Sequence, residues 1–539
     1  MSGIRDHFFR NIELEGDPIV EAIEQLQRDV ESINGTLSDI ALWQTTISGN
    51  IEELYGDVLR ISENLSDFFE EYIGFRNKIL GADVTFVKWH GAVGDGVTDD
   101  TEAIQAALDS GKTYVIFDKD GGYLVSSSGY GDACLKVPSN THLIGLGATI
   151  INRTPSSIAI VNKSPALTNP TLGDGYTANG NIIIEELNFL GTNESSLGMI
   201  GFAHCHDVKI INCNFKDLGG WHFIELNSTK NAIISGCHFS NYVGSNLTEM
   251  VQLDMATNAD VFPFFGPYDG TNTHNVIIKD CTFENPTAYY EDSNHYFDVV
   301  PAAIGNHNAT AIASGNVHHI HVINCTFENM HTCLKFSALR NSIISGNNAV
   351  AVRHFFNMTN PESEATNFFA GLKICDNRLI TSPLPSSIIT ISQSTRTRCI
   401  GFGGINCEIS NNDIYGWSGY AICVNGNGHI IVGNSVTACG RKGIYLFGNN
   451  NVVCNDNKVY NNCSYEMEGD HDITVVPDGS STATCNAIIS GNLFGTVGLS
   501  NVGAVGCAFV NNVVKTSVTK SATDDTIYHN NLVNGSWIS

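Results

Sequence analysis

The sequence predicts an all-β solenoid that follows a long helical stalk. A six-residue pattern recurs twelve times between residues 210 and 532, and an unbroken heptad pattern of apolar residues occupies residues 19–72. Repeats of roughly 20 residues are typical of solenoids, in which each unit stacks on the next one. A heptad pattern sustained over this length is typical of coiled coils.

The six-residue pattern begins with an apolar residue, any residue, and Asn, Gly or Asp, and continues with Asn or Cys, any residue and a second apolar residue. Examples are IINCNF at 210 and ISGNLF at 489, and IYHNNL at 527 is a weaker last copy. The short spacings between copies cluster near 22 residues, the length of one solenoid coil. We expect the central Asn or Cys side chains to stack as a ladder. They occupy positions 213, 237, 281, 325, 347, 377, 412, 434, 457, 492, 512 and 530.

A helical stalk is predicted for residues 17–80. Asp17 and Pro18 form a strong helix start, and the apolar a and d positions that follow are interrupted only by Gln44. Isoleucine is frequent at both positions, which favours three or four strands over two, and the seam would be about 80 Å long. A single amphipathic helix lying on the solenoid is the alternative, but eight heptads are too regular for it. We assign residues 1–16 as a short attachment segment.

Residues 84–125 read VTFVKWHGAVGDGVTDDTEAIQAALDSGKTYVIFDKDGGYLV and predict a strand, a Gly/Asp-rich turn, an amphipathic helix and a second strand. Asp99 and Glu102 form a predicted capping box. In this interpretation Asp99 and Asp100 serve the turn and the helix start rather than catalysis. The apolar face of the helix consists of Ile104, Ala107 and Leu108.

This stretch resembles the N-terminal signature of the pectate-lyase-like right-handed parallel β-helix, which occurs in phage tailspikes and in many polysaccharide-degrading enzymes. The resemblance implies a single-stranded β-helix whose open end is plugged by the short α-helix. A cap is physically required, because an uncapped solenoid exposes its apolar core and free strand edges. We therefore expect one β-helix domain at 81–539, with its cap at 84–111 and its coils at about 112–535.

Composition narrows the choice of partners. A formal net charge of −27 argues against nucleic acid or an anionic membrane as a partner. The N-terminus lacks the apolar core of a signal peptide, and no apolar run reaches membrane-spanning length.

Sixteen cysteines are present, and those at 213, 237, 281 and 325 share one phase of the repeat, which predicts free buried thiols and folding in a reducing cytoplasm. No spacing resembles a zinc site, and we expect no metal or cofactor.

Two neighbouring coils align as HFIELN at 222–227 and EMVQLD at 249–254. Strand alternation then places Ile224, Leu226, Val251 and Leu253 inside. The outward positions are Phe223, Glu225, Asn227, Met250, Gln252 and Asp254. EMVQLD is also similar to a Glu-x-Ile-Gln-Ile-Asp string of tailspike β-helices.

Carboxylates at these outward positions are candidates for glycoside hydrolysis, which needs one acid and one base or nucleophile. Glu225 and Asp254 would lie one strand apart and two residues along, roughly 8 Å from each other. That separation suits an inverting mechanism, for which about 6.5–9.5 Å is typical. Glu249 is a rival acid, because alternation is unreliable at the first residue of a strand. A solvated surface acid is the alternative interpretation of each one.

Candidate substrate contacts come from the same strands and from two aromatic-rich insertions, 260–270 and 289–300. Aromatic side chains are platforms for sugar rings, although they also serve contacts between loops or subunits. The candidates are His222, Phe223, Gln252, Phe264, Tyr268, Asp269 and Tyr296.

The resemblance implies a homotrimeric phage tailspike that joins a virion tail or baseplate protein through its N-terminus. Such a protein is assembled in the host cytoplasm and depolymerises a capsule or O-antigen, with hydrolysis favoured. The sequence lacks the Asn-Thr-Asp and Gly-His-Gly motifs of polygalacturonases and the Arg-x-Pro-x-x-Arg motif of pectate lyases. A polysaccharide lyase therefore stays open, since a His/Tyr/Lys set can abstract a proton. A non-catalytic receptor-binding fibre and a cellular polysaccharide enzyme are further alternatives.

The isoleucine-rich seam predicts a trimer, because Ile at both a and d positions disfavours dimers. Light scattering on the intact chain should return three times the 58.2 kDa chain mass. Deletion of residues 1–75 should weaken assembly and leave the solenoid folded. A monomer or dimer mass for the intact chain would contradict the stalk.

Overall fold

The computed structural model describes residues 25–29, 31–32, 83–127, 133–155, 157–163, 175–191, 198–242, 248–256, 266–285, 302–306, 317–358, 369–381, 398–463, 471–476, 487–499, 508–519 and 527–538. The chain divides into two compact units, Met1–Ala82 and Asp83–Ser539. In the first unit, residues 25–29 and 31–32 are helical. The rest of the predicted attachment segment and stalk, and with it the predicted trimer seam, lies outside the described residues. No helix among the described residues is long and apolar enough to cross a membrane.

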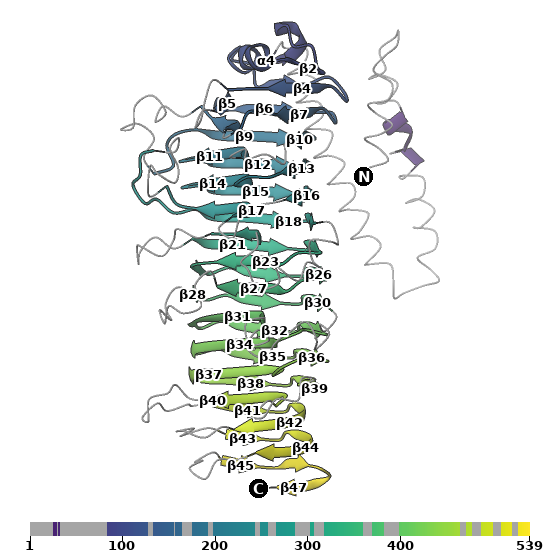
Figure 1. Ribbon diagram of the computed structural model, residues 1–539, viewed down its shortest axis with the longest axis vertical. Helices are drawn as coiled ribbons and strands as arrows, with labels where there is room; N and C mark the ends of the chain where they lie inside the picture. Colours follow the sequence, from purple (N-terminus) through teal and green to yellow (C-terminus); the bar gives the residue numbers. More distant parts are fainter. Residues whose placement is uncertain are drawn as a thin grey trace. The chain divides into compact units, whose positions relative to one another are not determined.

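The second unit is a parallel β-helix whose coils stack from the cap at α4 to β47 (Figure 1). Its strands form three long sheets, and each coil contributes about one strand to each sheet. Among the described strands, all pairs are parallel except the last, β46 with β47. The predicted all-β solenoid is therefore confirmed.

Sheet 1 consists of β1 (Val84–Phe86), β3 (Tyr114–Ile116), β6 (Thr141–Ile144), β9 (Gly180–Glu185), β12 (His206–Ile211), β15 (Lys230–Ser235), β18 (His274–Lys279), β21 (His318–Ile323), β24 (Leu339–Arg340), β25 (Ile343–Ser345), β28 (Phe369–Ala370), β29 (Lys373–Cys375), β32 (Glu408–Ser410), β35 (Ile430–Val432), β38 (Val452–Asn455), β41 (Ala487–Ser490), β43 (Ala508–Val510) and β45 (Ile527–His529). Sheet 2 consists of β2 (Asp95–Asp99), β4 (Gly122–Val125), β7 (Thr149–Asn152), β10 (Asn188–Leu190), β13 (Asn214–Leu218), β16 (His238–Tyr242), β19 (Thr282–Glu284), β22 (Thr326–Glu328), β26 (Asn348–Val350), β30 (Arg378–Ile380), β33 (Asp413–Tyr415), β36 (Ser435–Thr437), β39 (Lys458–Tyr460), β42 (Leu493–Leu499), β44 (Val513–Thr519), β46 (Asn531–Val533) and β47 (Ser536–Ile538). Sheet 3 consists of β5 (Ala133–Val137), β8 (Ile158–Asn162), β11 (Gly198–Ala203), β14 (His222–Asn227), β17 (Glu249–Asp254), β20 (Ala302–Gly305), β23 (Thr332–Phe336), β27 (His354–Met358), β31 (Arg398–Ile405), β34 (Tyr420–Asn427), β37 (Ile444–Asn450) and β40 (Ile473–Val476).

The cap consists of the short 3-10 helix η1 (Val87–His90) and the helix α4 (Thr101–Leu108). The α4 side chains Ile104, Ala107 and Leu108 are buried and belong to the main core cluster. An apolar helix face therefore closes the first coil, as predicted.

The predicted capping box at the start of α4 is wrong. Asp100 is the N-cap residue and its side chain makes no capping bond, while Asp99 lies in β2 and accepts a hydrogen bond from Thr101 N at 3.0 Å. The Asp100 carboxylate instead accepts the main-chain N–H groups of Val93 and Gly94, at 2.6 and 3.0 Å. Asp100 thus closes the Gly/Asp-rich turn and Asp99 bonds the first residue of α4, the structural roles that the sequence favoured over catalysis.

A ladder of buried asparagines runs through the corner between sheets 1 and 2 in the C-terminal half of the solenoid. Each Nδ2 donates to the Oδ1 of the next residue at 2.9–3.1 Å. Each amide also bonds the main chain, as Asn434 Nδ2 does to Ile409 O at 2.9 Å. The ladder consists of Asn347, Asn377, Asn412, Asn434, Asn457, Asn492, Asn512 and Asn531. The last member is Asn531 rather than the predicted Asn530, so the last copy was placed one residue early.

Cysteines occupy the same corner in the N-terminal half. Cys237 Sγ lies 3.5 Å from Ile210 O of the preceding coil, and burial raises the pKa of Cys237 well above its usual range. Fourteen cysteines are described, all of them free thiols and all buried except Cys463, which is half-buried. The prediction of free thiols is therefore confirmed for the described positions.

The backbone conformation explains why the third position of the repeat is Asn, Gly or Asp. The residue before each ladder residue has a φ between 52° and 69°, as in Asn212, Gly236 and Asp280. Gly, Asn and Asp are the residues that adopt this left-handed conformation at least cost. The second apolar position forms a stack of parallel rings with centroids 4.7–5.2 Å apart, close to the strand spacing. These rings belong to Phe189, Phe215, Phe239, Phe283 and Phe327.

The asparagine ladder should contribute measurably to stability. Asn434→Ala removes the bonds to Asn412 and Asn457 and leaves their buried groups unpaired, so we expect the free energy of unfolding to fall by about 2–3 kcal/mol. The matched control is Asn348→Ala, at a half-buried position whose contact with Arg378 is 3.4 Å long. It should change the free energy by less than about 0.5 kcal/mol. Urea unfolding measures both, and equal shifts would contradict the structural role of the ladder.

Candidate active site on the outer face of sheet 3

The predicted alignment of two coils is confirmed by the register of β14 and β17. Glu225 pairs with Gln252, and Asn227 pairs with Asp254. The inward residues predicted between them, Ile224, Leu226, Val251 and Leu253, all belong to the core. Glu225 and Asp254 therefore lie diagonally, one strand apart and two residues along.

Phe223 does not lie on this face, and its predicted role as a substrate contact is wrong. Its ring is fully buried in the core, 5.4 Å from the ring of Tyr242 and 5.9 Å from that of Phe215. Met250, which follows Glu249, is also a core residue. Strand pairing is interrupted at this position, since the register with β11 passes from His222 to Ile224. The regular alternation of β14 therefore starts only at Ile224, and two successive residues point inward.

The candidate carboxylates face outward but are buried, which the sequence did not predict. Glu225 is 3% exposed and Asp254 is fully buried. Asn227 Nδ2 donates to Glu225 Oε1 at 2.9 Å, and Gln252 Nε2 donates to Asp254 Oδ2 at 3.2 Å. Asp254 Oδ1 also accepts the main-chain N–H of Met255 at 2.9 Å. A side-chain amide two residues away in the same strand thus orients each carboxylate.

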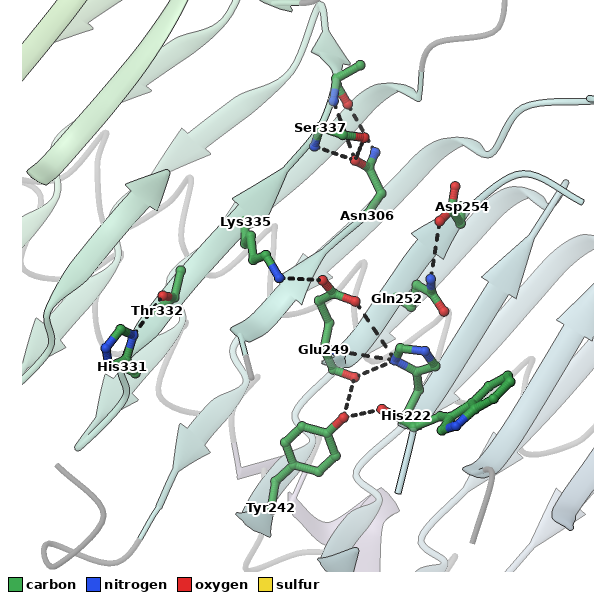
Figure 2. Close-up of polar contacts among 12 residues, drawn as sticks. His222, Tyr242, Glu249, Gln252, Asp254, Asn306, His331, Thr332, Lys335 and Ser337 are labelled. Carbon is green, nitrogen blue, oxygen red and sulfur yellow. Dashed lines mark hydrogen bonds and ion pairs between the residues drawn. The ribbon is translucent and has the colours of Figure 1, made fainter. Parts of the chain in front are cut away.

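Glu249 lies in a buried ion pair with Lys335, a residue that sequence reasoning missed. Glu249 Oε1 is 3.7 Å from Lys335 Nζ, and Glu249 Oε2 is 4.0 Å from His222 Nδ1 (Figure 2). All three side chains are at most 4% exposed. Burial lowers the pKa of Lys335, although the neighbouring Glu249 carboxylate acts in the opposite direction.

Small residues in the intervening strand make this ion pair possible. Glu249 is in β17 and Lys335 is in β23, so the pair spans β20, where Ala302 pairs with Glu249 and Gly305 with Lys335. A Cβ at Gly305 would collide with the main-chain oxygen of Lys335 and would lie 3.1 Å from Glu249 Cγ. The space above β20 is therefore filled by the Glu249 side chain.

The main chain around Glu249 is fixed by two further residues. The Tyr242 hydroxyl donates to Trp221 O and lies 3.3 Å from Glu249 O. His222 Nδ1 lies 2.7 Å from Glu249 O (Figure 2). The tautomer that carries its proton on Nδ1 donates a hydrogen bond to this oxygen. These contacts tie the starts of β14 and β17 together.

The predicted aromatic insertions are represented by Tyr268 and Asp269, since Phe264 and Tyr296 lie outside the described residues. Tyr268 and Trp221 both pack against a small apolar cluster that includes Ala203 of sheet 3. Ala203 is the strand partner of Asn227. Asp269 is exposed and accepts hydrogen bonds from Gly175 N at 2.8 Å and Thr271 N at 2.9 Å. Partial burial opposes ionisation of Asp269, but these two N–H donors outweigh it and lower its pKa. Asp269 thus holds two segments together.

Among the described residues, no group of three or more His, Cys, Asp or Glu side chains is arranged to hold a metal ion.

Comparison with known proteins places this fold among several classes. No family model matches the chain. The plasmin and fibronectin-binding protein A of Streptococcus pneumoniae is 27% identical over 294 residues, 48% of this chain and 38% of that protein. The pre-neck appendage protein of Bacillus phage B103 is 27% identical over 201 residues, 36% of this chain and 19% of that protein. Mannuronan C5-epimerase AlgE1 of Azotobacter vinelandii is 44% identical over 71 residues, 12% of this chain and 5% of that protein. The chain spans well under two thirds of each relative.

Among solved structures, PfbA, a surface adhesin of Streptococcus pneumoniae, superposes with a TM-score of 0.53 at 19% sequence identity, covering 70% of this chain and 90% of that chain. The chain therefore has the right-handed parallel β-helix fold, as its cap sequence and repeat predicted.

The buried ion pair can be tested through stability. Lys335→Met leaves Glu249 buried without its cation, so we expect the free energy of unfolding to fall by about 3–5 kcal/mol. The double variant Lys335→Met/Glu249→Gln should regain most of that loss. The matched control is Lys373→Met in the exposed pair of Lys373 and Glu408, 3.4 Å apart, where less than about 1 kcal/mol is expected. Similar losses for both lysines, measured by urea unfolding, would contradict a buried pair.

Proposed function

We propose that this chain is a phage tail protein that binds a bacterial surface polysaccharide, a capsule or an O-antigen, and cleaves it on the outer face of sheet 3. The observation that carries the proposal is the diagonal pair Glu225 and Asp254, each oriented by a neighbouring amide. The similarity to a phage pre-neck appendage protein supports the virion location, and the similarity to mannuronan epimerases supports a glycan as substrate. The proposal includes a homotrimer attached to the virion through its N-terminal segment.

Hydrolysis is the reaction that this pair fits best. Asp254 accepts a main-chain N–H on Oδ1 and the Gln252 amide on Oδ2, so both of its oxygens are held in place, and we assign it as the base that activates water. Glu225, which accepts the Asn227 side-chain amide at 2.9 Å, is assigned as the proton donor to the leaving oxygen. The diagonal spacing of roughly 8 Å leaves room for the attacking water of an inverting mechanism.

Elimination is a second candidate, and Lys335 is the observation that favours it. Burial lowers the pKa of Lys335, which enlarges its neutral fraction, and a neutral amine can take a proton from the carbon next to a uronate carboxylate. Mass spectrometry of the products separates the two reactions, because hydrolysis adds one water per bond cleaved and elimination leaves an unsaturated sugar.

A binding protein without catalysis is the third candidate, since the adhesin shares this fold. The purified full-length protein should be incubated with polysaccharides from a panel of capsule and O-antigen types, preceded by halo screening on the corresponding lawns. Release of oligosaccharides supports an enzyme. Retention on one polysaccharide without release would replace the enzyme with a receptor-binding fibre.

The assigned pair predicts the effect of isosteric substitutions. Glu225→Gln and Asp254→Asn should each lower turnover by about 10²–10⁴-fold, because each removes one partner of general acid–base catalysis. Glu328→Gln, at an exposed position of β22, is the matched control and should keep wild-type turnover. Circular dichroism must show that the variants fold, because Glu225 and Asp254 are buried.

Glu249→Gln completes this series. Loss of activity in Glu249→Gln alone would move the acid to Glu249, whereas wild-type turnover in all three variants would exclude this face as the catalytic site.

A further inference from the structure

The outer face of sheet 3 changes its charge along the solenoid. Acidic side chains lie in β14 and β17, and Lys335 follows in β23. The next strands, β27, β31, β34 and β37, contain no Asp or Glu, while Arg398 starts β31 and Lys442 precedes β37. In a chain with a formal net charge of −27, such a stretch requires an explanation.

Arg398 lies across the sheet. Its aliphatic stem passes over Gly401, where an added Cβ would lie 2.6 Å from Arg398 Cδ. Arg398 itself is half-exposed, yet its Nε is buried without a hydrogen-bond partner in the structure as described. A guanidinium donor that is withdrawn from water and not used by the protein is a group that a ligand can satisfy.

The positive charges of Arg398 and Lys442 both lie near Cys423 of the strand between them. Gly401 pairs with Cys423, and Cys423 pairs with Tyr445, so three neighbouring strands meet there. Burial raises the pKa of the Cys423 thiol, and the charges of Arg398 and Lys442 both act to lower it. The two cations therefore flank one outward position from either side.

Aromatic rings complete the surface beside Lys442. Its Nζ lies 4.9 Å from the ring centroid of Tyr445 and 5.6 Å from that of Tyr420. The half-exposed rings of Tyr445 and Phe447 are 5.2 Å apart and inclined by 25°. The two rings are therefore stacked on each other, and this half-exposed stack offers aromatic surface to the C–H groups of a pyranose, while the cations hold a charged substituent.

We propose that Arg398 and Lys442, with Tyr445 and Phe447, form a subsite for a sugar that carries an anionic group, a carboxylate or a phosphate. The subsite rests on the proposed function for its ligand class, a polysaccharide. At about 4.8 Å per strand, β31 and β37 lie roughly 19 and 29 Å from β17, so a chain running along sheet 3 reaches both regions. The subsite therefore selects acidic polysaccharides and positions them relative to Glu225 and Asp254.

The test is affinity electrophoresis of the full-length protein in gels that contain dextran, carboxymethyl-dextran or phosphodextran. The protein is strongly acidic, so an anionic polymer repels it in bulk, and retardation requires a local cationic site. We expect anionic dextrans to retard the protein more than unmodified dextran, and the ratio of the two anionic arms identifies carboxylate or phosphate. The variant Arg398→Gln/Lys442→Gln should weaken that retention at least tenfold.

The matched control is Lys373→Gln/Lys458→Gln, which removes the same charge from exposed positions on sheets 1 and 2 and should retain wild-type binding. Equal losses in both double variants, or no preference for the anionic polymers, would overturn the subsite. A changed oligomer mass in Arg398→Gln/Lys442→Gln would instead assign these cations to a subunit contact and also overturn it.

Failure of the subsite is distinguishable from failure of the proposed enzyme. Glu225→Gln should still bind anionic dextran, because the subsite lies several strands away. Cleavage of a neutral polysaccharide without any preference for anionic polymers would support the proposed enzyme and overturn the subsite. Retention on anionic polymers without any cleavage would support the subsite and overturn the proposed enzyme.

Discussion

The site depends on the corner between sheets 1 and 2, where one buried side chain per coil contacts a neighbouring coil. In the coils of the site this side chain is a cysteine, as in Cys237, whose Sγ lies 3.5 Å from Ile210 O of the preceding coil. From Asn347 onward asparagine amides bridge successive coils at 2.9–3.1 Å, and in both halves the preceding residue turns the chain in a left-handed conformation. A coil that slipped by one residue would reverse the inside and outside of every strand. The corner therefore fixes the outward column on the far sheet, in which Glu225, Gln252, Gly305 and Lys335 follow one another.

Much of this could be predicted from the sequence, because the repeat has a local cause. Left-handed turns demand Asn, Gly or Asp, and a buried stack demands the same residue type in every coil, so both leave marks that recur at coil spacing. The pairing of Glu225 with Gln252 followed from the same reasoning. Phe223 was misplaced because alternation holds only within a regular strand, and the chain is still leaving the corner at that residue.

Lys335 could not be predicted from the sequence. Its partner Glu249 lies 86 positions earlier, and the two meet only because Ala302 and Gly305 are small. The burial of Glu225 and Asp254 could not be predicted either. An alternation of apolar and polar residues predicts which side chains point outward, but it does not predict how much of each side chain is exposed to solvent. Outward direction and solvent contact are separate properties on a solenoid.

The change from cysteine to asparagine along the corner has a consequence for where the protein can be oxidised. Thiols occupy the N-terminal half of the column, where they are buried away from solvent. A buried thiol reacts with oxidants only when its coil opens. Within the corner, oxidation should then be confined to the N-terminal coils and report their opening rate, because the asparagine ladder of the C-terminal half contains no thiol. The residue type that fills the corner thus also sets where this column can be oxidised.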